Sequence, residues 1–588
     1  MRDERRLILD TVLLGIVGAL CAQLFQWLLR VSEEFFLNWL ASYQPPILPS
    51  DGGTLHEVIG AHGLWLIPVA TTLGGFLVGL LVYSFAPEAE GHGTDTAVKS
   101  FHYQGGFLRP RVPPLKILAS AITIGSGGAG GREGPTALIS AGIGSVYGTW
   151  TRRDEAERRL LVLIGMASGL SAIFRSPIGT AIFAIEVLYG GMELEAGALL
   201  YTLLGSVVAY AVNGLFTGWE PLFQVPSNLA PPTFFEYGWY VVLGITAGLV
   251  ATLLPVVFYG MRDGFRKLPI PPHFKPAIGG LGVGLLALQW PQTLAGGYGW
   301  IQKAIDGQLS TDLMVVLIFV EMVALALTIS SGGSGGVFAP SLYVGAMLGG
   351  TLARVFHQPI AAFVVVGMAA VFSGAARVPV ATLLMVTEMT GGYHLLVPAA
   401  LAVVLSFMIQ GALARHLKYK SLYEAQVPER VDSPAHHLEH VEAALKLLRD
   451  KKLSVPPDGT HLDLRQLLAA GIPVDLPDRK RLLMGVLDAE SSYVGKRLAL
   501  CFPVANQDHL ELIAVLRGGH TLLPHTNVRL QAGDCLLVIA SLEGQEQLAP
   551  HLAAIARIGD AEPPATGRGQ SKRTKPAEPP LSRPRRTD

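Results

Sequence analysis

The sequence has little charge and almost no cysteine. Only 15% of its 588 residues are Asp, Glu, Lys or Arg, whereas soluble domains carry about 25%. Basic and acidic residues are equal in number, 45 each, so no net charge favours a nucleic-acid partner and none is expected. The three cysteines make neither a disulfide framework nor a metal-ligand spacing; they are Cys21, Cys501 and Cys535. We therefore expect no disulfide scaffold and no bound metal.

Long polar stretches are also absent before about residue 415, where apolar segments follow one another. The first runs from Leu7 to Leu29 behind a basic start, and it is too long for the core of a signal peptide. Several later segments are short and are interrupted by glycine or proline, a pattern typical of discontinuous membrane helices. We expect apolar segments at roughly 8–30, 63–86, 115–150, 159–190, 197–215, 237–262, 276–291, 313–330, 341–356, 360–374, 379–391 and 396–413. The predicted fold class is an all-α polytopic membrane protein.

Two similar glycine loops interrupt this apolar sequence, at Ile124–Pro135 and at Ile329–Pro340. Each predicts a helix that breaks at glycines and restarts at a turn containing proline, where a missing N–H costs nothing. A broken helix is tolerated at membrane depth only where the freed backbone lines a cavity. Each restarted helix would point unpaired N–H groups and a positive dipole end into that cavity. Two such ends facing each other would form an anion site.

The two halves share more than these loops, and their charges indicate opposite orientations. Further features recur in order, namely Gly-Met-Ala at 165–167 and 367–369, Arg-x-Pro at 175–177 and 377–379, and Glu186 and Glu388. Both ends of the duplicated region are basic, while no Lys or Arg lies between Arg175 and Arg262. By the positive-inside rule both termini are cytoplasmic, so each half crosses the membrane an odd number of times. This predicts inverted repeats, at about 8–215 and 237–416, with a site near the membrane midplane.

The composition changes after Tyr423, where a soluble region begins. We expect a membrane domain at 1–430, a polar linker with a helical pattern near Ala443–Leu448 at 431–475, and a small cytoplasmic α/β domain at 476–556. The strands expected in this domain are Leu482–Leu487, Leu512–Leu516, Val528–Gln531 and Cys535–Ala540. The basic, proline-rich tail at 557–588 is predicted to be disordered, and contact with anionic lipid is a weaker alternative.

One motif suggests a nucleotide-binding enzyme but is set in the wrong context. Gly125–Gly130 formally matches the dinucleotide fingerprint G-x-G-x-x-G. It lacks the acidic residue about 20 positions later and the βαβ setting. The Gly-Lys-Ser/Thr ending of a phosphate-binding P-loop is missing as well. We therefore expect a transport protein that is not an enzyme and needs no cofactor, with the shared physics of anion binding at a helix start retained.

Gly131–Pro135 (GREGP) and Gly336–Pro340 (GVFAP) resemble the GREGP and GxFxP signatures of the CLC family of chloride channels and chloride/proton antiporters. The resemblance covers about residues 10–425. Residues 494–496, 517–519 and 533–534 of the soluble region resemble the TrkA-C (RCK C-terminal) ligand-sensing domain. The family resemblance implies a homodimer with one pore per subunit, chloride or a similar monovalent anion as the transported ligand, and a small regulatory ligand at the C-terminal domain.

Glu133 is the predicted gate. An ionisable side chain inside a membrane is functional by default, and its charge would occupy the anion site until protonation or an incoming anion displaced it. The resemblance implies the same role. The predicted anion-binding set comprises Gly131, Arg132, Gly134, Gly336, Val337, Phe338 and His92. The resemblance adds Tyr423, whose hydroxyl could donate to the anion, whereas the residues alone would favour a tyrosine at the membrane interface. Arg132 is expected to act more as a structural or field-shaping charge than as a direct ligand.

Two positions depart from the family pattern. The family's GSGIP motif maps onto Gly91–Asp95, so His92 replaces the serine that would donate to the anion. Its imidazole could donate instead, or it could face away and leave binding to backbone N–H groups. Asp95 could satisfy the helix dipole or oppose the anion. The second departure is Val187, which follows Glu186 where the antiporters carry a proton-passing glutamate.

A valine cannot carry a proton, so the sequence favours passive, channel-like conduction gated by Glu133. Two alternatives stay open. One is a proton-coupled antiporter with another inner proton donor, such as water or His92. The other is a membrane-anchored ligand sensor that no longer conducts. We expect the protein in a prokaryotic plasma membrane, in contact with lipid.

Overall fold

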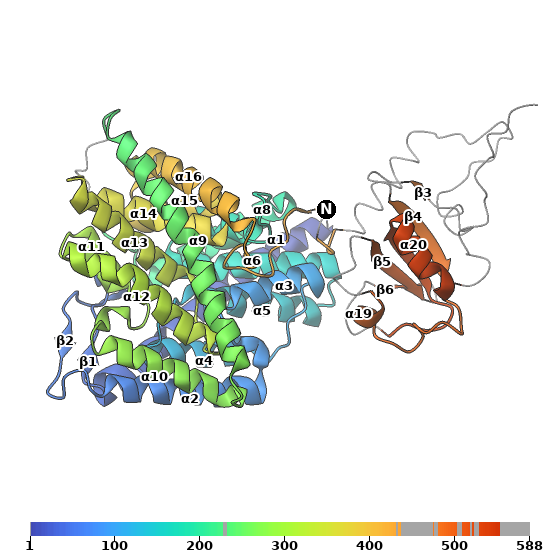
Figure 1. The fold of residues 1–588 in the computed structure, drawn as a ribbon, viewed down its shortest axis with the longest axis horizontal. Helices are drawn as coiled ribbons and strands as arrows, with labels where there is room; N and C mark the ends of the chain where they lie inside the picture. Colours follow the sequence, from blue (N-terminus) through green and yellow to red (C-terminus); the bar gives the residue numbers. More distant parts are fainter. Residues whose placement is uncertain are drawn as a thin grey trace, which may run out of the picture. The chain divides into compact units, whose positions relative to one another are not determined.

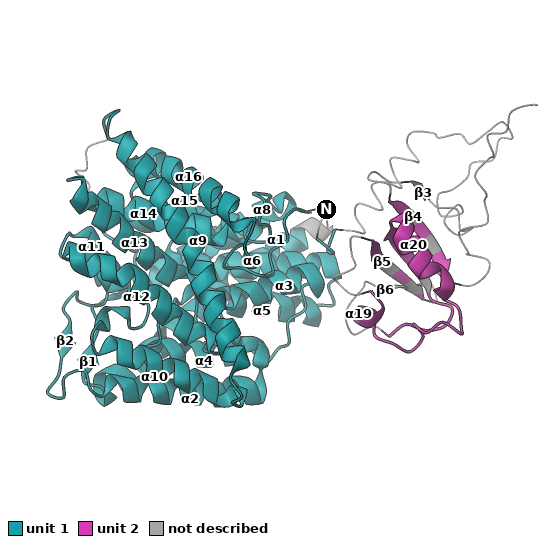
Figure 2. Ribbon diagram, viewed as in Figure 1, with its two compact units in different colours: residues 1–440 teal, residues 441–588 magenta. Residues whose placement is uncertain are grey.

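The structure, a computed structural model, describes residues 2–226, 232–430, 433–436, 474–475, 480–502, 509–517, 520–522 and 529–552. The chain forms two compact units, 1–440 and 441–588 (Figure 2). The first unit extends beyond the domain boundary expected at residue 430. The helical pattern near 443–448 and the basic tail at 557–588 lie outside the described residues.

The first unit is a bundle of helices joined by loops (Figure 1). Its first half contains α1 (Arg2–Glu33), α2 (Ile67–Phe85), α3 (Thr94–Tyr103), α4 (Val112–Gly125), α5 (Glu133–Trp150), α6 (Glu155–Phe174), α7 (Pro177–Glu186) and α8 (Leu199–Thr217). Its second half contains α9 (Tyr237–Lys267), α10 (Lys275–Ala287), α11 (Tyr298–Ile305), α12 (Thr311–Ser330), α13 (Phe338–Val355), α14 (Ile360–Ala376), α15 (Pro379–Thr390) and α16 (Leu396–Ala414). A two-stranded ribbon of β1 (Tyr43–Gln44) and β2 (Val58–Ile59) follows α1.

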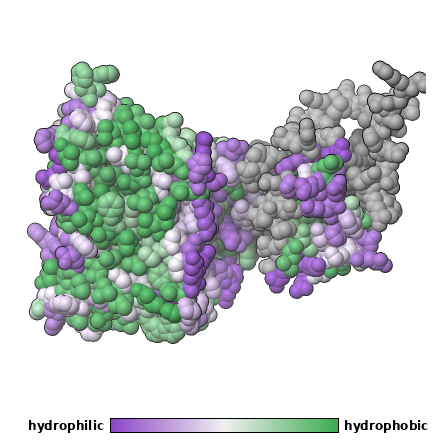
Figure 3. Space-filling model, viewed as in Figure 1, coloured by the Kyte–Doolittle hydropathy of each residue, from purple (hydrophilic) through white to green (hydrophobic). Residues whose placement is uncertain are grey.

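This unit has the surface and the helix lengths of a membrane protein. Within the described residues, 6 helical segments are long and apolar enough to cross a membrane. Other apolar helices are shorter, among them α4, α7, α14 and α15, as the interrupted segments predicted. Figure 3 shows a broad hydrophobic face over the first unit, with hydrophilic residues gathered along its margins. An apolar belt of this kind requires lipid or a partner to cover it.

The internal duplication is visible in the backbone. Helices α5 to α8 correspond in order to α13 to α16. Arg175 and Arg377 end the equivalent helices α6 and α14 in the left-handed conformation, with φ of 54° and 58°. Gly127 and Gly332 hold φ of 100° and 106° in the two glycine loops, a conformation that a residue with a Cβ rarely adopts. The loops therefore have the same backbone shape as well as similar sequences.

Glycines allow the helices of each half to cross closely. A Cβ at Gly345 in α13 would lie 2.3 Å from the carbonyl oxygen of Gly367 in α14, and one at Gly367 would lie 2.3 Å from that of Gly345. In the first half, a Cβ at Gly165 in α6 would lie 2.3 Å from the carbonyl oxygen of Ser140 in α5. Small residues permit such backbone contact in membrane helix pairs. The Gly-Met-Ala repeat thus marks the crossing that places α5 and α13 at the centre.

The second unit contains a small mixed α/β fold. Its sheet has the strand order β3-β4-β7-β5-β6, with β3 (Val474–Asp475), β4 (Arg481–Val486), β5 (Leu510–Arg517), β6 (His520–Leu522) and β7 (Cys535–Ala540). Neighbouring strands are antiparallel, and the short helices are α19 (Leu498–Cys501) and α20 (Leu542–Leu548). Three predicted strands correspond to β4, β5 and β7. In the fourth, Val528–Gln531, the described part forms only an isolated bridge between Arg529 and Arg497.

Candidate anion site

The two glycine loops lie against each other at the centre of the first unit. The N–H of Gly131 donates to the carbonyl of Gly336 at 2.8 Å, and the N–H of Gly336 donates to the carbonyl of Gly131 at 2.6 Å. This reciprocal, antiparallel pair joins equivalent positions of the two repeats, as expected for halves related by a two-fold operation. The inverted arrangement predicted from the sequence therefore brings the starts of α5 and α13 together.

A buried cavity lies where these two helices begin, and a third helix, α3, begins there too. The cavity is lined by Thr94, Glu133, Gly134, Leu170, Phe174, Phe183, Val337, Phe338 and Tyr423. Thr94 starts α3, Glu133 starts α5 and Phe338 starts α13. The first N–H groups of a helix have no partner within it, and its N-terminus carries about half a positive charge. Three such ends around one cavity make a strong site for an anion.

The Glu133 carboxylate fills part of this cavity. Its side chain is 2% exposed, and neither carboxylate oxygen has a hydrogen-bond partner of regular geometry among the described residues. A buried carboxylate without such partners is costly, so the surrounding helix ends must supply the compensating field. This is the position that a transported anion would take.

Two hydroxyl groups and several aromatic rings complete the lining. Thr94 is 3% exposed and Tyr423 is 2% exposed, and both line the cavity. The ring of Phe338 packs on those of Phe174 and Phe372, with centroids 4.4 and 4.2 Å apart. Hydroxyl donors in an apolar wall can bind an anion that has lost its water. The sequence pattern did not indicate Thr94, although it follows Gly93 in the Gly91–Asp95 motif.

Four predicted anion ligands do not line this cavity. The N–H groups of Gly131 and Gly336 are already used in bonding each other, so these glycines join the loops instead of donating to an anion. Arg132 turns away and forms an ion pair with Asp51 at 2.9 Å, with its guanidinium 4.7 Å from the ring centre of Tyr298. His92 packs on the ring of Tyr423 at 5.4 Å from outside the cavity. The four others, Gly134, Val337, Phe338 and Tyr423, lie in the lining.

A buried cation near the cavity was also missed. Lys116 in α4 is 0% exposed and donates to the carbonyls of Ala89 and Gly91 at 3.0 and 2.7 Å. Its Cε would lie 3.1 Å from a Cβ placed on Gly93, one residue before Thr94. The two hydrogen bonds of Lys116 tie α4 to the loop that precedes α3. A lysine within an apolar helix is the sequence signal that indicates this residue.

Val187 occupies the position where the family's antiporters carry a proton-passing glutamate, and its side chain is buried. Val187 directly follows α7 and is 0% exposed, within the hydrophobic core. The neighbouring Glu186 accepts hydrogen bonds from the N–H groups of Val380 and Ala381 at 3.0 and 2.6 Å. Both of its oxygens therefore have structural partners. Among the described residues, no group of three or more His, Cys, Asp or Glu side chains could hold a metal ion.

Discontinuous helices in inverted repeats, with their N-termini around a buried cavity, define a membrane protein that transports anions. The family described as "Voltage gated chloride channel" matches residues 74–411. This chain belongs to that family. It is 32% identical to the H(+)/Cl(-) exchange transporter ClcA of Salmonella arizonae, over 72% of this chain and 88% of the relative. It is 29% identical to the voltage-gated ClC-type chloride channel ClcB of Salmonella dublin, over 72% of this chain and 99% of the relative.

Solved structures show the same fold. The chain matches a slow cyanobacterial Cl−/H+ antiporter with a TM-score of 0.61 and 21% identity, over 71% of this chain and 96% of the other. It matches a CLC-type fluoride/proton antiporter with a TM-score of 0.61 and 23% identity, over 73% of this chain and 99% of the other. These matches confirm the predicted inverted-repeat architecture with discontinuous helices.

Proposed function

We propose that this protein conducts chloride or a similar monovalent anion passively and that Glu133 is its gate. The observation that carries the proposal is the position of the Glu133 carboxylate, buried where α3, α5 and α13 begin. An anion arriving at these helix ends would compete with the carboxylate for the same positive field. Protonation would remove the charge and release the side chain from that field. Either event opens the path.

The passive mode is supported by what surrounds the end of α7. Val187 has no group that can take up a proton, and Glu186 is engaged by two backbone N–H groups. A proton relay through this position would need a carboxylate that is free to change its protonation state. Nothing at Val187 supplies one. Anion movement without obligatory proton movement follows.

Proton-coupled exchange is the second candidate, favoured by the relatives. ClcA is named an exchange transporter, and both solved structures above are of antiporters. In that case another group must carry the inner proton, with water or His92 as the candidates from the sequence. A non-conducting membrane-anchored sensor is the third candidate, and it is disfavoured by the intact cavity where α3, α5 and α13 begin.

The test is the ratio of anion flux to proton flux in liposomes that contain the purified full-length protein. Passive conduction predicts that chloride flux stops at the chloride equilibrium potential and moves no protons against their gradient. Uphill proton movement driven by a chloride gradient would establish exchange instead. Absence of any anion flux would favour the third candidate, the non-conducting sensor. Protein-free liposomes provide the control for leak.

The remaining assignments belong to the same proposal. We place both termini in the cytoplasm of a prokaryote, with the protein in its plasma membrane, because basic residues gather at both ends of the duplicated region. The apolar face of the first unit suits lipid and a second copy in a homodimer. The second unit, TrkA-C-like in its motifs, would bind a small regulatory ligand.

A further inference from the structure

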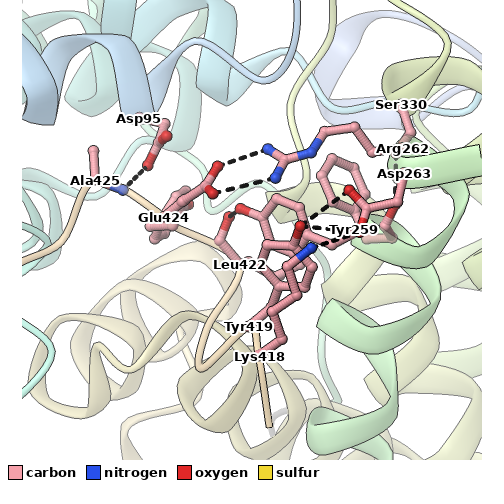
Figure 4. Close-up of polar contacts among 12 residues, drawn as sticks. Asp95, Tyr259, Arg262, Asp263, Ser330, Lys418, Tyr419, Leu422, Glu424 and Ala425 are labelled. Carbon is pink, nitrogen blue, oxygen red and sulfur yellow. Dashed lines mark hydrogen bonds and ion pairs between the residues drawn. The ribbon is translucent and has the colours of Figure 1, made fainter. Parts of the chain in front are cut away.

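The chain around Tyr423 is held by three different helices. On the side before Tyr423, the N–H of Leu422 donates to the carbonyl of Ala375 in α14 at 2.9 Å. The carbonyl of Leu422 accepts from the hydroxyl of Tyr259 in α9 at 2.8 Å (Figure 4). These two bonds fix the backbone on one side of the tyrosine.

On the other side, Glu424 forms a two-pronged ion pair with Arg262 of α9, at 2.7 and 3.2 Å. The Arg262 guanidinium lies 4.2 Å from the ring centre of Tyr259. The Glu424 side chain is 50% exposed, and exposed ion pairs contribute little. This ion pair therefore contributes less to the stability of the segment around Tyr423 than the buried hydrogen bonds of Leu422 do.

The third anchor is Asp95. Its Oδ1 accepts from the backbone N–H of Ala425 at 2.7 Å (Figure 4). Asp95 directly follows Thr94 at the start of α3, and Ala425 stands two residues after Tyr423. One carboxylate thus links the two chain segments that carry the cavity's two hydroxyl groups. A hydrogen bond to an ionised acceptor is about twice as strong as a neutral one.

We propose that Asp95 is a positioning residue that fixes the separation of the Thr94 and Tyr423 hydroxyl groups and so sets which monovalent anion the cavity prefers. The inference rests on the proposed anion transport through this cavity. Anions such as chloride and nitrate differ in size and shape, so two rigidly spaced donors distinguish them better than two mobile ones. Because the carboxylate is engaged by Ala425, it acts on the anion through this spacing and not as a ligand.

The experiment compares chloride and nitrate fluxes in liposomes for the full-length protein and three variants. D95A removes the acceptor, and D95N keeps a neutral oxygen acceptor in nearly the same shape. D263N is the matched control, because Asp263 accepts hydrogen bonds from Lys418 and Tyr419, which precede Tyr423 in the same segment. We expect D95A to conduct with a chloride-to-nitrate ratio changed by roughly threefold or more. D95N should shift the ratio less and in the same direction, and D263N should not shift it.

An unchanged ratio in D95A overturns the proposal. So does a shift in D95N as large as that in D95A, because both variants lack the negative charge, and its loss rather than loss of the hydrogen bond would then be the cause. If D95A does not fold, D95N decides alone, since its weaker acceptor must still move the ratio. Absence of anion flux in the unmodified protein would instead refute the proposed function.

Discussion

Glu186 and Glu388 cap each other's helices across the two repeats. Glu186, at the end of α7, accepts from the N–H groups of Val380 and Ala381 at the start of α15. Glu388, near the end of α15, accepts from the N–H of Gly179 at 2.9 Å and from the hydroxyl of Ser176 at 2.5 Å, at the start of α7. Each carboxylate satisfies N–H groups that the neighbouring helix cannot satisfy itself. The paired glutamates therefore hold the two halves together.

This reciprocal capping predicts a stability loss when either glutamate is shortened. E186A and E388A would each leave buried donors without partners, which costs about 1–3 kcal/mol. E186Q and E388Q should be milder because the amide oxygen still accepts. Thermal unfolding of the detergent-solubilised protein checks this, with E220Q as the control, since the Glu220 side chain is exposed. Equal unfolding temperatures for E186A and E220Q would contradict a structural role for Glu186.

The central architecture could be predicted because glycine loops and internal repeats are easily recognised in the amino-acid sequence. Helix breaks at glycine and restarts near proline follow from local chemistry, and α5 and α13 begin within these loops as expected. The order of the recurring motifs was enough to indicate a duplication. The similar φ values of Gly127 and Gly332 are the conformational counterpart of that repeat.

The detailed lining could not be predicted because it depends on tertiary contacts. Sequence spacing indicates that Gly131 and Gly336 belong to facing loops, but not that their N–H groups bond each other. Similarly, motif alignment selects His92, whereas the turn at Gly93 brings Thr94 to the cavity. The partner of Arg132, Asp51, lies in a different loop with no shared motif. Side-chain direction in an irregular loop is not fixed by any periodicity.

The proposed gating role of Glu133 predicts that the E133Q variant conducts anions constitutively. The amide carries no charge, so it cannot compete with an anion for the field of the three helix ends, and it cannot be titrated. Chloride flux in liposomes should rise, and its dependence on pH should be lost. E220Q should behave like the unmodified protein. Unchanged flux together with an unchanged pH response in E133Q would refute the gating role.

The lining predicts different consequences for Thr94 and His92. T94V preserves the shape of the side chain but removes a hydroxyl donor from the cavity. Chloride affinity should therefore fall several-fold, which corresponds to the free energy of about one hydrogen bond. H92Q changes a residue outside the lining and should leave the affinity close to that of the unmodified protein. Isothermal titration of the purified protein with chloride measures both. If H92Q lowered the chloride affinity more than T94V, His92 and not Thr94 would be the anion ligand.

The last prediction concerns Glu195, which lies in the loop between α7 and α8, outside the membrane-spanning helices. Burial alone raises its pKa, but hydrogen bonds from His436 and Tyr189 and the charges of His436 and Arg430 outweigh it and lower the pKa to about 2. A glutamate in an unfolded chain has a pKa of about 4.3. The ionised form therefore stabilises the fold above that value, and this stabilisation is lost as the pH falls towards 2.

The measurement is the unfolding temperature of the unmodified protein and of E195Q, followed from about pH 6 down to the acid limit of solubility. The unmodified protein should be the more stable of the two near pH 6, by at most ~3 kcal/mol. The difference should shrink below about pH 4.3, because protonation makes Glu195 resemble glutamine. Since His436 and Arg430 belong to the segment that follows Tyr423, a difference that persisted at low pH would mean that the carboxylate's shape, and not its charge, holds that segment in place.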